Sequence, residues 1–331
     1  MTGARGEEHT VSDRDASGND GGPTVADIGE FGLIERSVAG RSWPAEVQIG
    51  PGDDAAVVAA PGGSVVVTTD MLVQDRHFSL DWSSHHDIGR KAIAQNAADI
   101  AAMGARCTGF LVSMSCPSTT PVDDLDRLTE GLWDEAARAG ATIVGGDVTG
   151  GSSLVLSITA LGDLDDRAPV LRSGARVGDV LALSAATGRS AAGLALFLAG
   201  VDDYPELLAA HRVPSPVYDD GPEAAVAGAS SMCDVSDGVT GDAAHIATAS
   251  GVGLDIVSGS MDISDFADAA AHLGVDPVGW ALGGGEDHAF LATFDPRDVP
   301  DGWRVIGSVV DGSGVTVDGE VWEGPATWTS F

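Results

Sequence analysis

Basic side chains are scarce in this chain of 331 residues, which has 17 lysines and arginines against 50 aspartates and glutamates and a formal net charge of −33. Lys91 is the only lysine. A negative field of this strength repels the phosphates of nucleic acids and the anionic surface of membranes. We therefore expect neither a nucleic acid nor a membrane as a partner. Most of the carboxylates lack a basic partner, so we expect them to be hydrated or bound to cations.

Cysteine and long apolar runs are scarce as well. The three cysteines, Cys107, Cys116 and Cys233, form an odd set without a C-x-x-C pair, which argues against a disulfide framework and against a zinc site. No apolar run reaches the about 18 residues that a membrane-spanning helix requires, and the start of the chain lacks the apolar segment of a secretory signal. These absences predict a cytoplasmic protein.

Length and composition predict two domains, because a typical domain has about 150 residues and the apolar content of 44% suffices for well-formed cores. Residues 1–26 are polar and aperiodic, which predicts a disordered acidic tail. A charged turn at 163–167 separates two apolar runs. We therefore expect an N-terminal domain over 27–163 and a C-terminal domain over 164–331.

Hydrophobic periodicity predicts alternating helices and strands. The expected helices cover 28–38, 87–103, 121–140, 190–198 and 241–249, with Pro121 at the first helical position. The expected strands cover 55–60, 65–69, 109–115, 142–144, 154–161, 180–183, 232–235, 254–257 and 288–294, and a hairpin is expected after Trp303.

Carboxylates beside glycines or hydroxyls recur where apolar strands are expected to end. They lie in the segments 50–54, 68–70, 145–147, 234–238 and 283–287. Neighbouring carboxylates on a tight loop repel each other unless a cation lies between them. If these strand ends converge, they form an oxygen cage for several Mg²⁺ ions, as in enzymes that use nucleoside triphosphates. Each segment alone is also explained by a turn cap or a solvated loop.

The helix expected over 87–103 carries polar residues on one face. Lys91 and Gln95 fit an ordinary solvated stripe, but Asn96 and Asp99 lie among alanines and isoleucine, where hydration is less available. We therefore favour Asp99 as a metal ligand. The glycines at 283–285 allow backbone N–H groups to approach a phosphate, although a flexible turn is an equal alternative.

Two common nucleotide-binding motifs are disfavoured. The spacing G-x-G-x-x-A at 50–55 imitates a dinucleotide fingerprint, but a strand is expected to follow it, so no helix N-terminus would face the phosphate. A P-loop is excluded because Lys91 is not preceded by the required glycines.

The ordered blocks GEFGLI, GPGDDAAVV, TTDMLVQDRHF, KAIAQNAADIAAMGA, GGD, LRSGARVGD, DVSDG and GGGEDH resemble the thiamine-monophosphate kinase family over residues 27–331. The resemblance implies the two-domain α/β fold, with mixed sheets, of aminoimidazole ribonucleotide synthetase. It implies an N-terminal sheet that pairs across a homodimer and a C-terminal domain that covers the active-site cleft. The implied reaction is direct in-line phosphoryl transfer from ATP to thiamine monophosphate, assisted by Mg²⁺, without a covalent nucleophile.

By matching positions, the resemblance also implies three sets of site residues. The magnesium ligands or their near neighbours are Asp53, Asp54, Thr69, Asp70, Asp99, Asp147, Asp234 and Asp237. The ATP contacts are Thr68, Gly146, Asp147, Arg172 and Ser236. The contacts to thiamine monophosphate are His77, Glu286 and Trp328. Arg172 suits phosphate because its guanidinium can hold two oxygens, although a surface ion pair also explains it.

Other functions remain open. Selenophosphate synthetase, on the same fold, is expected to carry a reactive N-terminal cysteine or selenocysteine, and the hydrogenase-maturation relative a C-terminal cysteine; neither feature occurs in the sequence. A non-catalytic cation-binding protein would carry a calcium-loop spacing, which is absent. A phosphohydrolase that uses the same Mg²⁺ cage to direct water at a phosphate is not excluded.

Overall fold

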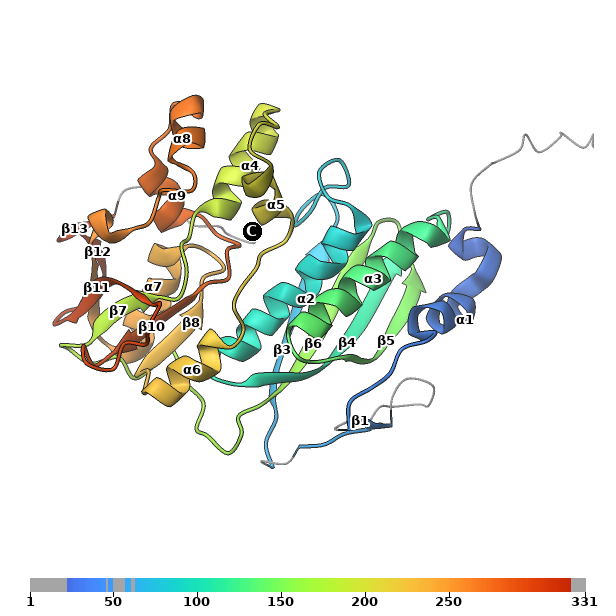
Figure 1. Cartoon of the computed structure of the whole chain (residues 1–331), viewed down its shortest axis with the longest axis horizontal. Helices are drawn as coiled ribbons and strands as arrows, with labels where there is room; N and C mark the ends of the chain where they lie inside the picture. Colours follow the sequence, from blue (N-terminus) through green and yellow to red (C-terminus); the bar gives the residue numbers. More distant parts are fainter. Residues whose placement is uncertain (1–22, 46, 50–56, 61–62, 323–331) are drawn as a thin grey trace, which may run out of the picture.

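The computed structural model describes residues 23–45, 47–49, 57–60 and 63–322. Figure 1 shows two bodies side by side, each with its own sheet, and the long helix α2 (His85–Ala102) lies in the first body near the junction. The expected fold class, α/β with mixed sheets, is confirmed. Within the described residues, no helix is both long and apolar enough to cross a membrane.

The N-terminal half is a helical layer on a four-stranded sheet of order β3-β6-β4-β5. Strand β6 is antiparallel to both of its neighbours, whereas β4 and β5 are parallel. Figure 1 shows α2 and α3 across one face of this sheet. Besides α2, the elements are α1 (Val25–Val38), β1 (Val47–Ile49), β2 (Val57–Val58), β3 (Val66–Val73), β4 (Arg106–Cys116), α3 (Val122–Arg138), β5 (Ile143–Gly150) and β6 (Val155–Asp163).

Helices α2 and α3 approach each other so closely that only glycine fits at two positions. A Cβ atom added to Gly89 would lie 2.1 Å from the carbonyl oxygen of Leu128, and one added to Gly131 would lie 2.0 Å from that of His86. Helix α2 begins with a capping box, in which Ser84 and Asp87 satisfy each other's backbone N–H groups. The buried face of α2 is rich in alanine, which brings the helix close to the sheet.

The C-terminal half is built on a seven-stranded sheet of order β13-β12-β9-β11-β7-β10-β8. Neighbouring strands in this sheet are antiparallel, except that β12 is parallel to β9. Its strands are β7 (Val180–Leu183), β8 (Ser231–Asp234), β9 (Gly253–Ile256), β10 (Phe290–Phe294), β11 (Arg304–Val310), β12 (Gly314–Val317) and β13 (Glu320–Val321). Its helices are α4 (Arg189–Ala199), α5 (Pro205–Arg212), α6 (Asp220–Ala227), α7 (Val239–Ser250), η1 (Ser258–Ser260), α8 (Ala267–Leu273) and α9 (Pro277–Gly283).

Several details differ from the sequence-based expectations. Strand β3 continues to Val73 and β5 continues to Gly150, so Asp70 and Asp147 lie inside strands and not at their ends. Pro121 occupies the N-cap of α3, one position before the first helical residue. The hairpin expected after Trp303 is present and is formed by β12 and β13, while β9 lies between β11 and β12 in the sheet. Helices α5, α6, α8 and α9 were not expected.

The two halves share a buried contact. One apolar cluster contains Ala98 and Ala101 of α2 together with Ala224 of α6 and Phe290 and Phe294 of β10. The cluster joins the helical layer of the N-terminal half to the C-terminal sheet, so the junction is part of the core.

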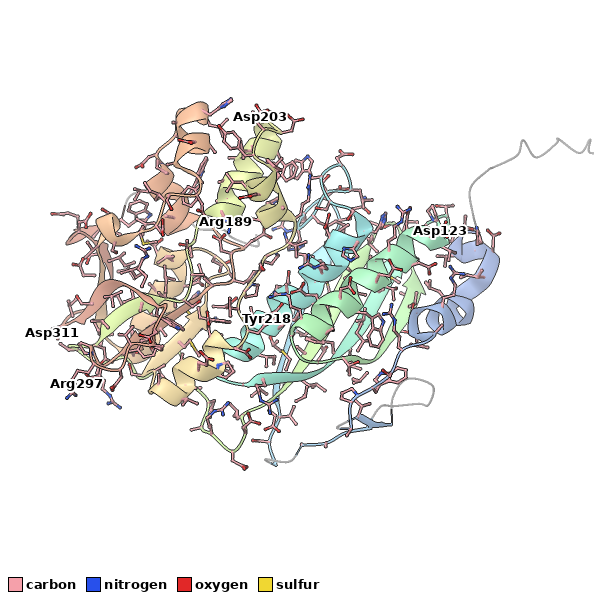
Figure 2. The ribbon with its side chains drawn as sticks, in the orientation of Figure 1. Asp123, Arg189, Asp203, Tyr218, Arg297 and Asp311 are labelled. Atoms are coloured by element: carbon pink, nitrogen blue, oxygen red, sulfur yellow. The ribbon has the colours of Figure 1, made fainter. Side chains whose placement is uncertain are left out.

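A polar contact holds the segment between α5 and α6 on the N-terminal half. The hydroxyl of Tyr218 donates a hydrogen bond of 2.7 Å to the carboxylate of Glu135, which is fully buried and paired with Arg90 and Arg138. Figure 2 shows Tyr218 in the middle of the molecule. By contrast, four labelled residues lie at its periphery in Figure 2: Asp123, Asp203, Asp311 and Arg297.

The close approach of α2 and α3 predicts that Gly131→Ala destabilises the protein, because the methyl group overlaps the His86 carbonyl and forces the helices apart. We expect the free energy of unfolding to fall by about 1–3 kcal/mol or more in urea denaturation. The control is Glu130→Ala, which changes an exposed residue of the same helix. Equal stability of the two variants would contradict the proposed packing.

Candidate active site between the two halves

Three acidic side chains from different elements converge at the junction of the two halves, and we call them the carboxylate cluster. Asp70 belongs to β3, Asp99 to α2 and Asp234 to β8. The Thr68 hydroxyl donates a hydrogen bond of 2.8 Å to Asp99, which fixes the α2 carboxylate against β3. The fully buried Asn96 accepts a hydrogen bond of 2.9 Å from the backbone N–H of Asp70.

Two of these carboxylates, Asp70 and Asp99, have raised pKa values. Burial, followed by the negative charges of Asp234 and Asp70, raises the pKa of Asp99 to about 7. Burial also raises the pKa of Asp70, against the opposing effect of a hydrogen bond from Gln95. Like charges in a partly desolvated site are unfavourable unless a cation compensates them. Carboxylate and hydroxyl oxygens are the ligands that Mg²⁺ prefers, so the donor set fits that ion.

His288 balances part of the negative charge. Its Nδ1 atom lies 2.8 Å from Oδ2 of Asp234, and both residues are buried. Burial opposes a charged imidazole, but the hydrogen bond to Asp234 and the negative charges of Asp234, Asp99 and Glu286 together raise the pKa of His288. Sequence reasoning did not assign His288 a role. The only sequence signal for His288 is its position directly after the acidic segment 283–287.

The segment after β8 adds a second acidic group. The carboxylate of Asp242 accepts hydrogen bonds of 3.0 and 3.1 Å from the backbone N–H groups of Asp237 and Gly238, and it thereby closes the turn into α7. Burial, followed by the charge of Asp234, raises the pKa of Asp242 to about 7. Burial also raises the pKa of Asp237, and the positive charge of Arg172 opposes this shift, which places the guanidinium within electrostatic reach of the turn. Ligand atoms of Asp237, Asp242 and His245 lie within 4.8 Å of one another.

The glycine-rich segment before Glu286 allows its backbone to approach the backbone after β8 closely. A Cβ atom on Gly285 would lie 2.4 Å from the carbonyl oxygen of Ser236. The same oxygen accepts a hydrogen bond of 2.8 Å from the Glu286 N–H, and the carbonyl of Val235 accepts one of 2.9 Å from His288. Glu286 and His288 have positive φ angles of 66° and 55°, which are uncommon for residues with a side chain. The loop is therefore held rigidly against the end of β8.

A cavity of about 520 Å³ adjoins this loop. Its walls come from the segment that follows β3, from α4 and α5, and from residues 283–286, so both halves line it. Glu286 lines the cavity, while His288, two residues further on, binds Asp234 of the carboxylate cluster. The loop thus connects the cavity to the cluster.

Lys91 fixes the polar end of the cavity. Its Nζ atom donates hydrogen bonds of 2.9 Å to the His77 carbonyl and 2.9 Å to Oε1 of Glu286, and the lysine is 2% exposed. Burial favours the neutral acid, but the charge of Lys91 and its hydrogen bond lower the pKa of Glu286. The imidazole Nδ1 of His77 accepts a hydrogen bond of 3.0 Å from the Val73 N–H at the end of β3. His77 and Glu286, both expected to contact substrate, therefore lie together.

His211 of α5 forms another part of the wall. Its Nδ1 atom lies 3.1 Å from the Ser190 hydroxyl and 3.6 Å from Oε2 of Glu286. Burial, reinforced by the charge of Lys91, lowers the pKa of His211 to about 4. The imidazole is therefore neutral at pH 7. Sequence reasoning missed this residue because it lies in a region without a recognised motif.

Two residues of the expected magnesium set lie away from the cluster. Thr69 is exposed and its hydroxyl donates a hydrogen bond of 2.9 Å to the Ile158 carbonyl. Asp147 aligns with Ser113 of β4, which aligns with Ser157 of β6 and then with Met71 of β3. Residues in one such row share a face of the sheet, and alternation places Asp70 on the other face. Within one chain, Asp147 therefore does not join Asp70.

Two further expected residues lie on β5 and after β8. Gly146 is exposed on β5, and Ser236 is part of the turn after β8. Asp53, Asp54 and Trp328 lie outside the described residues.

Comparison with known proteins defines the class first. Residues 52–164 match the AIR synthase related protein, N-terminal domain, and residues 176–320 match the AIR synthase related protein, C-terminal domain. Structures of the hydrogenase maturation protein HypE share the fold, with a TM-score of 0.70 at 17% identity over 89% of this chain and 90% of that one. The chain is thus a two-domain protein of the AIR synthase related class.

Closer relatives narrow the class. Thiamine-monophosphate kinase of Mycobacterium tuberculosis is 55% identical over 93% of both chains, and that of Corynebacterium glutamicum is 44% identical over 94% of this chain and 96% of its own length. The solved structure of AaThiL complexed with AMPPCP and TMP has a TM-score of 0.77 at 30% identity, and the match covers 92% of this chain and 97% of that one. The chain belongs to the thiamine-monophosphate kinase family, and the resemblance noted in the sequence is confirmed.

The neutral imidazole of His211 predicts a specific loss of stability in acid. The unfolded chain binds a proton at this histidine below its ordinary pKa of 6.5, whereas the folded chain does so only near pH 4. The folded state therefore loses stability as the pH falls through this window, by about 1–2 kcal/mol at pH 5. We expect His211→Gln to reduce the difference in free energy of unfolding between pH 7 and pH 5 by this amount.

The control for this measurement is His272→Gln, which changes an exposed histidine at the surface of α8. An equal pH dependence in wild type and His211→Gln would show that His211 is not held neutral by the fold.

Proposed function

We propose that this chain transfers the terminal phosphoryl group of ATP to thiamine monophosphate and produces ADP and thiamine diphosphate. The observation that carries the proposal is the convergence of Asp70, Asp99 and Asp234 beside a cavity lined by both halves, in a chain of the thiamine-monophosphate kinase family. The AaThiL structure supports both substrates, because AMPPCP is an analogue of ATP and TMP is thiamine monophosphate.

Mg²⁺ is the cation that we assign to the carboxylate cluster. Asp70, Asp99 and Asp234 are the described residues best placed to hold it, with Asp237 as a further ligand beside Asp234. When bound, Mg²⁺ neutralises charge on the phosphates and aligns them for in-line transfer. This chain's own contribution is to fix the carboxylates through Thr68 and Asn96, so that the site is formed before ATP arrives.

Binding ATP to so acidic a protein requires local positive charge. Arg172 is within electrostatic reach of Asp237 at the turn after β8, and we assign it to the phosphates of ATP together with Ser236. Direct transfer between two phosphate groups needs no nucleophilic side chain. The three cysteines fit this scheme because all are buried, and burial raises the pKa of Cys107 to about 12.

We assign the cavity to thiamine monophosphate. Lys91 holds one carboxylate oxygen of Glu286, and the other lies 3.6 Å from His211, so the carboxylate has a fixed orientation. In that orientation it can accept a hydrogen bond from an N–H group of the substrate. Because the loop that bears Glu286 continues to the carboxylate cluster, we place the substrate's phosphate toward the cluster and its rings in the cavity.

The direct experiment is to incubate the protein with ATP, MgCl₂ and thiamine monophosphate and to separate the products by chromatography. We expect thiamine diphosphate and ADP in equal amounts. Release of inorganic phosphate without thiamine diphosphate would instead indicate a phosphohydrolase. We propose that the protein acts in the cytoplasm, as expected from its sequence.

Asp70→Asn tests the metal assignment. Removing one charge from the cluster weakens its hold on Mg²⁺, and we expect kcat/KM to fall by at least about 100-fold, or about 3 kcal/mol of transition-state stabilisation. The substitution also relieves repulsion, so the thermal midpoint of the metal-free protein should not decrease.

Asp311→Asn is the matched control, since Asp311 is an exposed aspartate at the periphery (Figure 2). Turnover by Asp70→Asn at the level of this control would refute the metal assignment.

We further propose a homodimer that covers the open face of the N-terminal sheet. Strand β3 exposes Val67 and Met71 on that face, at 62% and 53% of their surface, Val65 just before the strand is 49% exposed, and Leu111 of β4 adds 36%. An exposed apolar row of this kind is typical of an interface. Asp147 lies on the same open face of the sheet, and three strand spacings of about 4.8 Å separate its strand β5 from β3. A role of Asp147 as a metal ligand therefore requires a second copy of the chain.

Val67→Glu tests the dimer. A carboxylate in the centre of an apolar interface has no partner there, and we expect the variant to be monomeric at micromolar concentration in sedimentation or light scattering. The control is Val226→Glu, which changes an exposed valine on α6, at 73%. A monomeric wild type, or dimers in both variants, would place the interface elsewhere or exclude it.

A further inference from the structure

The cavity beside Glu286 has two chemically different ends. His77 and Glu286, both bound by the buried Lys91 behind them, make one end polar. The other end is aromatic, because Trp82 from the segment between β3 and α2 also lines the cavity. The sequence patterns gave no role to Trp82, and the carboxylate cluster does not use it.

Trp82 is stacked on Phe197 of α4. The two ring centroids are 5.0 Å apart and the planes are inclined by 10°. Trp82 lines the cavity and Phe197 does not, so the stacked pair borders the cavity through its tryptophan. The indole is only partly buried.

Arg212 and His211 hold this wall from the other half. The Arg212 guanidinium donates a hydrogen bond to the Trp82 carbonyl, and its central carbon lies 5.1 Å from the centroid of the Phe197 ring. His211 packs its ring edgewise against Trp82, with centroids 6.3 Å apart. The aromatic end is therefore formed by side chains of both halves.

The backbone of Trp82 is equally fixed. Its N–H and that of Ser83 both donate to the carbonyl of Ser79, at 3.1 and 2.9 Å, and Ser84 then caps α2. A ring with a fixed backbone and one face covered by a parallel ring needs little further ordering when a ligand binds. These are the properties of a stacking platform for a flat ring.

We propose that Trp82 is a specificity-determining residue of the acceptor site, on whose indole a flat, positively charged heteroaromatic ring of the substrate stacks. The inference rests on the function proposed above, in which that ring is the thiazolium of thiamine monophosphate. An indole face attracts a cationic ring both by stacking and by its electron density. The ring lies at the aromatic end, and the phosphate points along the loop 286–288 toward the carboxylate cluster.

The test compares Trp82→Ala and Trp82→Phe with wild type. We expect Trp82→Ala to raise KM for thiamine monophosphate by about 10-fold or more, while KM for ATP stays within about 2-fold. Trp82→Phe retains a stacking face and should stay within about 3-fold of wild type. Tyr204→Ala is the control, because Tyr204 is an aromatic residue whose ring packs on His272, outside the cavity.

Calorimetric titration with thiamine monophosphate makes the test independent of turnover. Wild type and Trp82→Phe should bind it, and Trp82→Ala should bind at least about 10-fold more weakly. A wild type that binds thiamine monophosphate without forming thiamine diphosphate would refute the proposed function and leave the stacking intact. Trp82→Ala that binds as wild type does, or that weakens ATP binding equally, would overturn the inference. A wild type that binds no thiamine monophosphate would overturn both.

Discussion

The ion pair between the buried Lys91 and the partly exposed Glu286 is the interaction on which the arrangement of the site depends. It joins α2 of the N-terminal half to the loop before β10 of the C-terminal half, and the same ammonium group binds the carbonyl of His77. Removing Glu286 would leave the ammonium group of Lys91 buried without its counter-charge, which is unfavourable. The same ion pair therefore both fixes the polar end of the cavity and connects the two halves.

Helix α2 links this ion pair to the carboxylate cluster, because it carries residues of both at a fixed spacing. Lys91 reaches Glu286 at the cavity, Asn96 binds the backbone of Asp70, and Asp99 receives the Thr68 hydroxyl. These residues follow one another along a single helix, so the separation of cavity and carboxylate cluster is set by the helix itself. The close packing of α2 on α3, which requires glycine at two positions, prevents the helix from shifting.

Sequence patterns predicted the position of a residue when that position depends on a single helix or strand. The period of α2 revealed Asp99 as a polar group among apolar neighbours, and Asp234 lies at the end of its strand as expected. Patterns failed where the answer depended on pairing between strands. The side of the sheet on which Asp147 lies follows from its register with β4 and β6, which a single strand does not encode. Short helices such as α5, and with it His211, carry too few residues for a periodic signal.

A chain with a single lysine offers one side-chain amine to chemistry, and the fold hides it. Reagents that acylate amines would find the side chain of Lys91 only 3% exposed, behind the contact of the two halves. Apart from the chain's amino terminus, the rate of such labelling would measure one event, the separation of α2 from the loop of Glu286. The scarcity of lysine thus gives the molecule a built-in reporter of how often its two halves part.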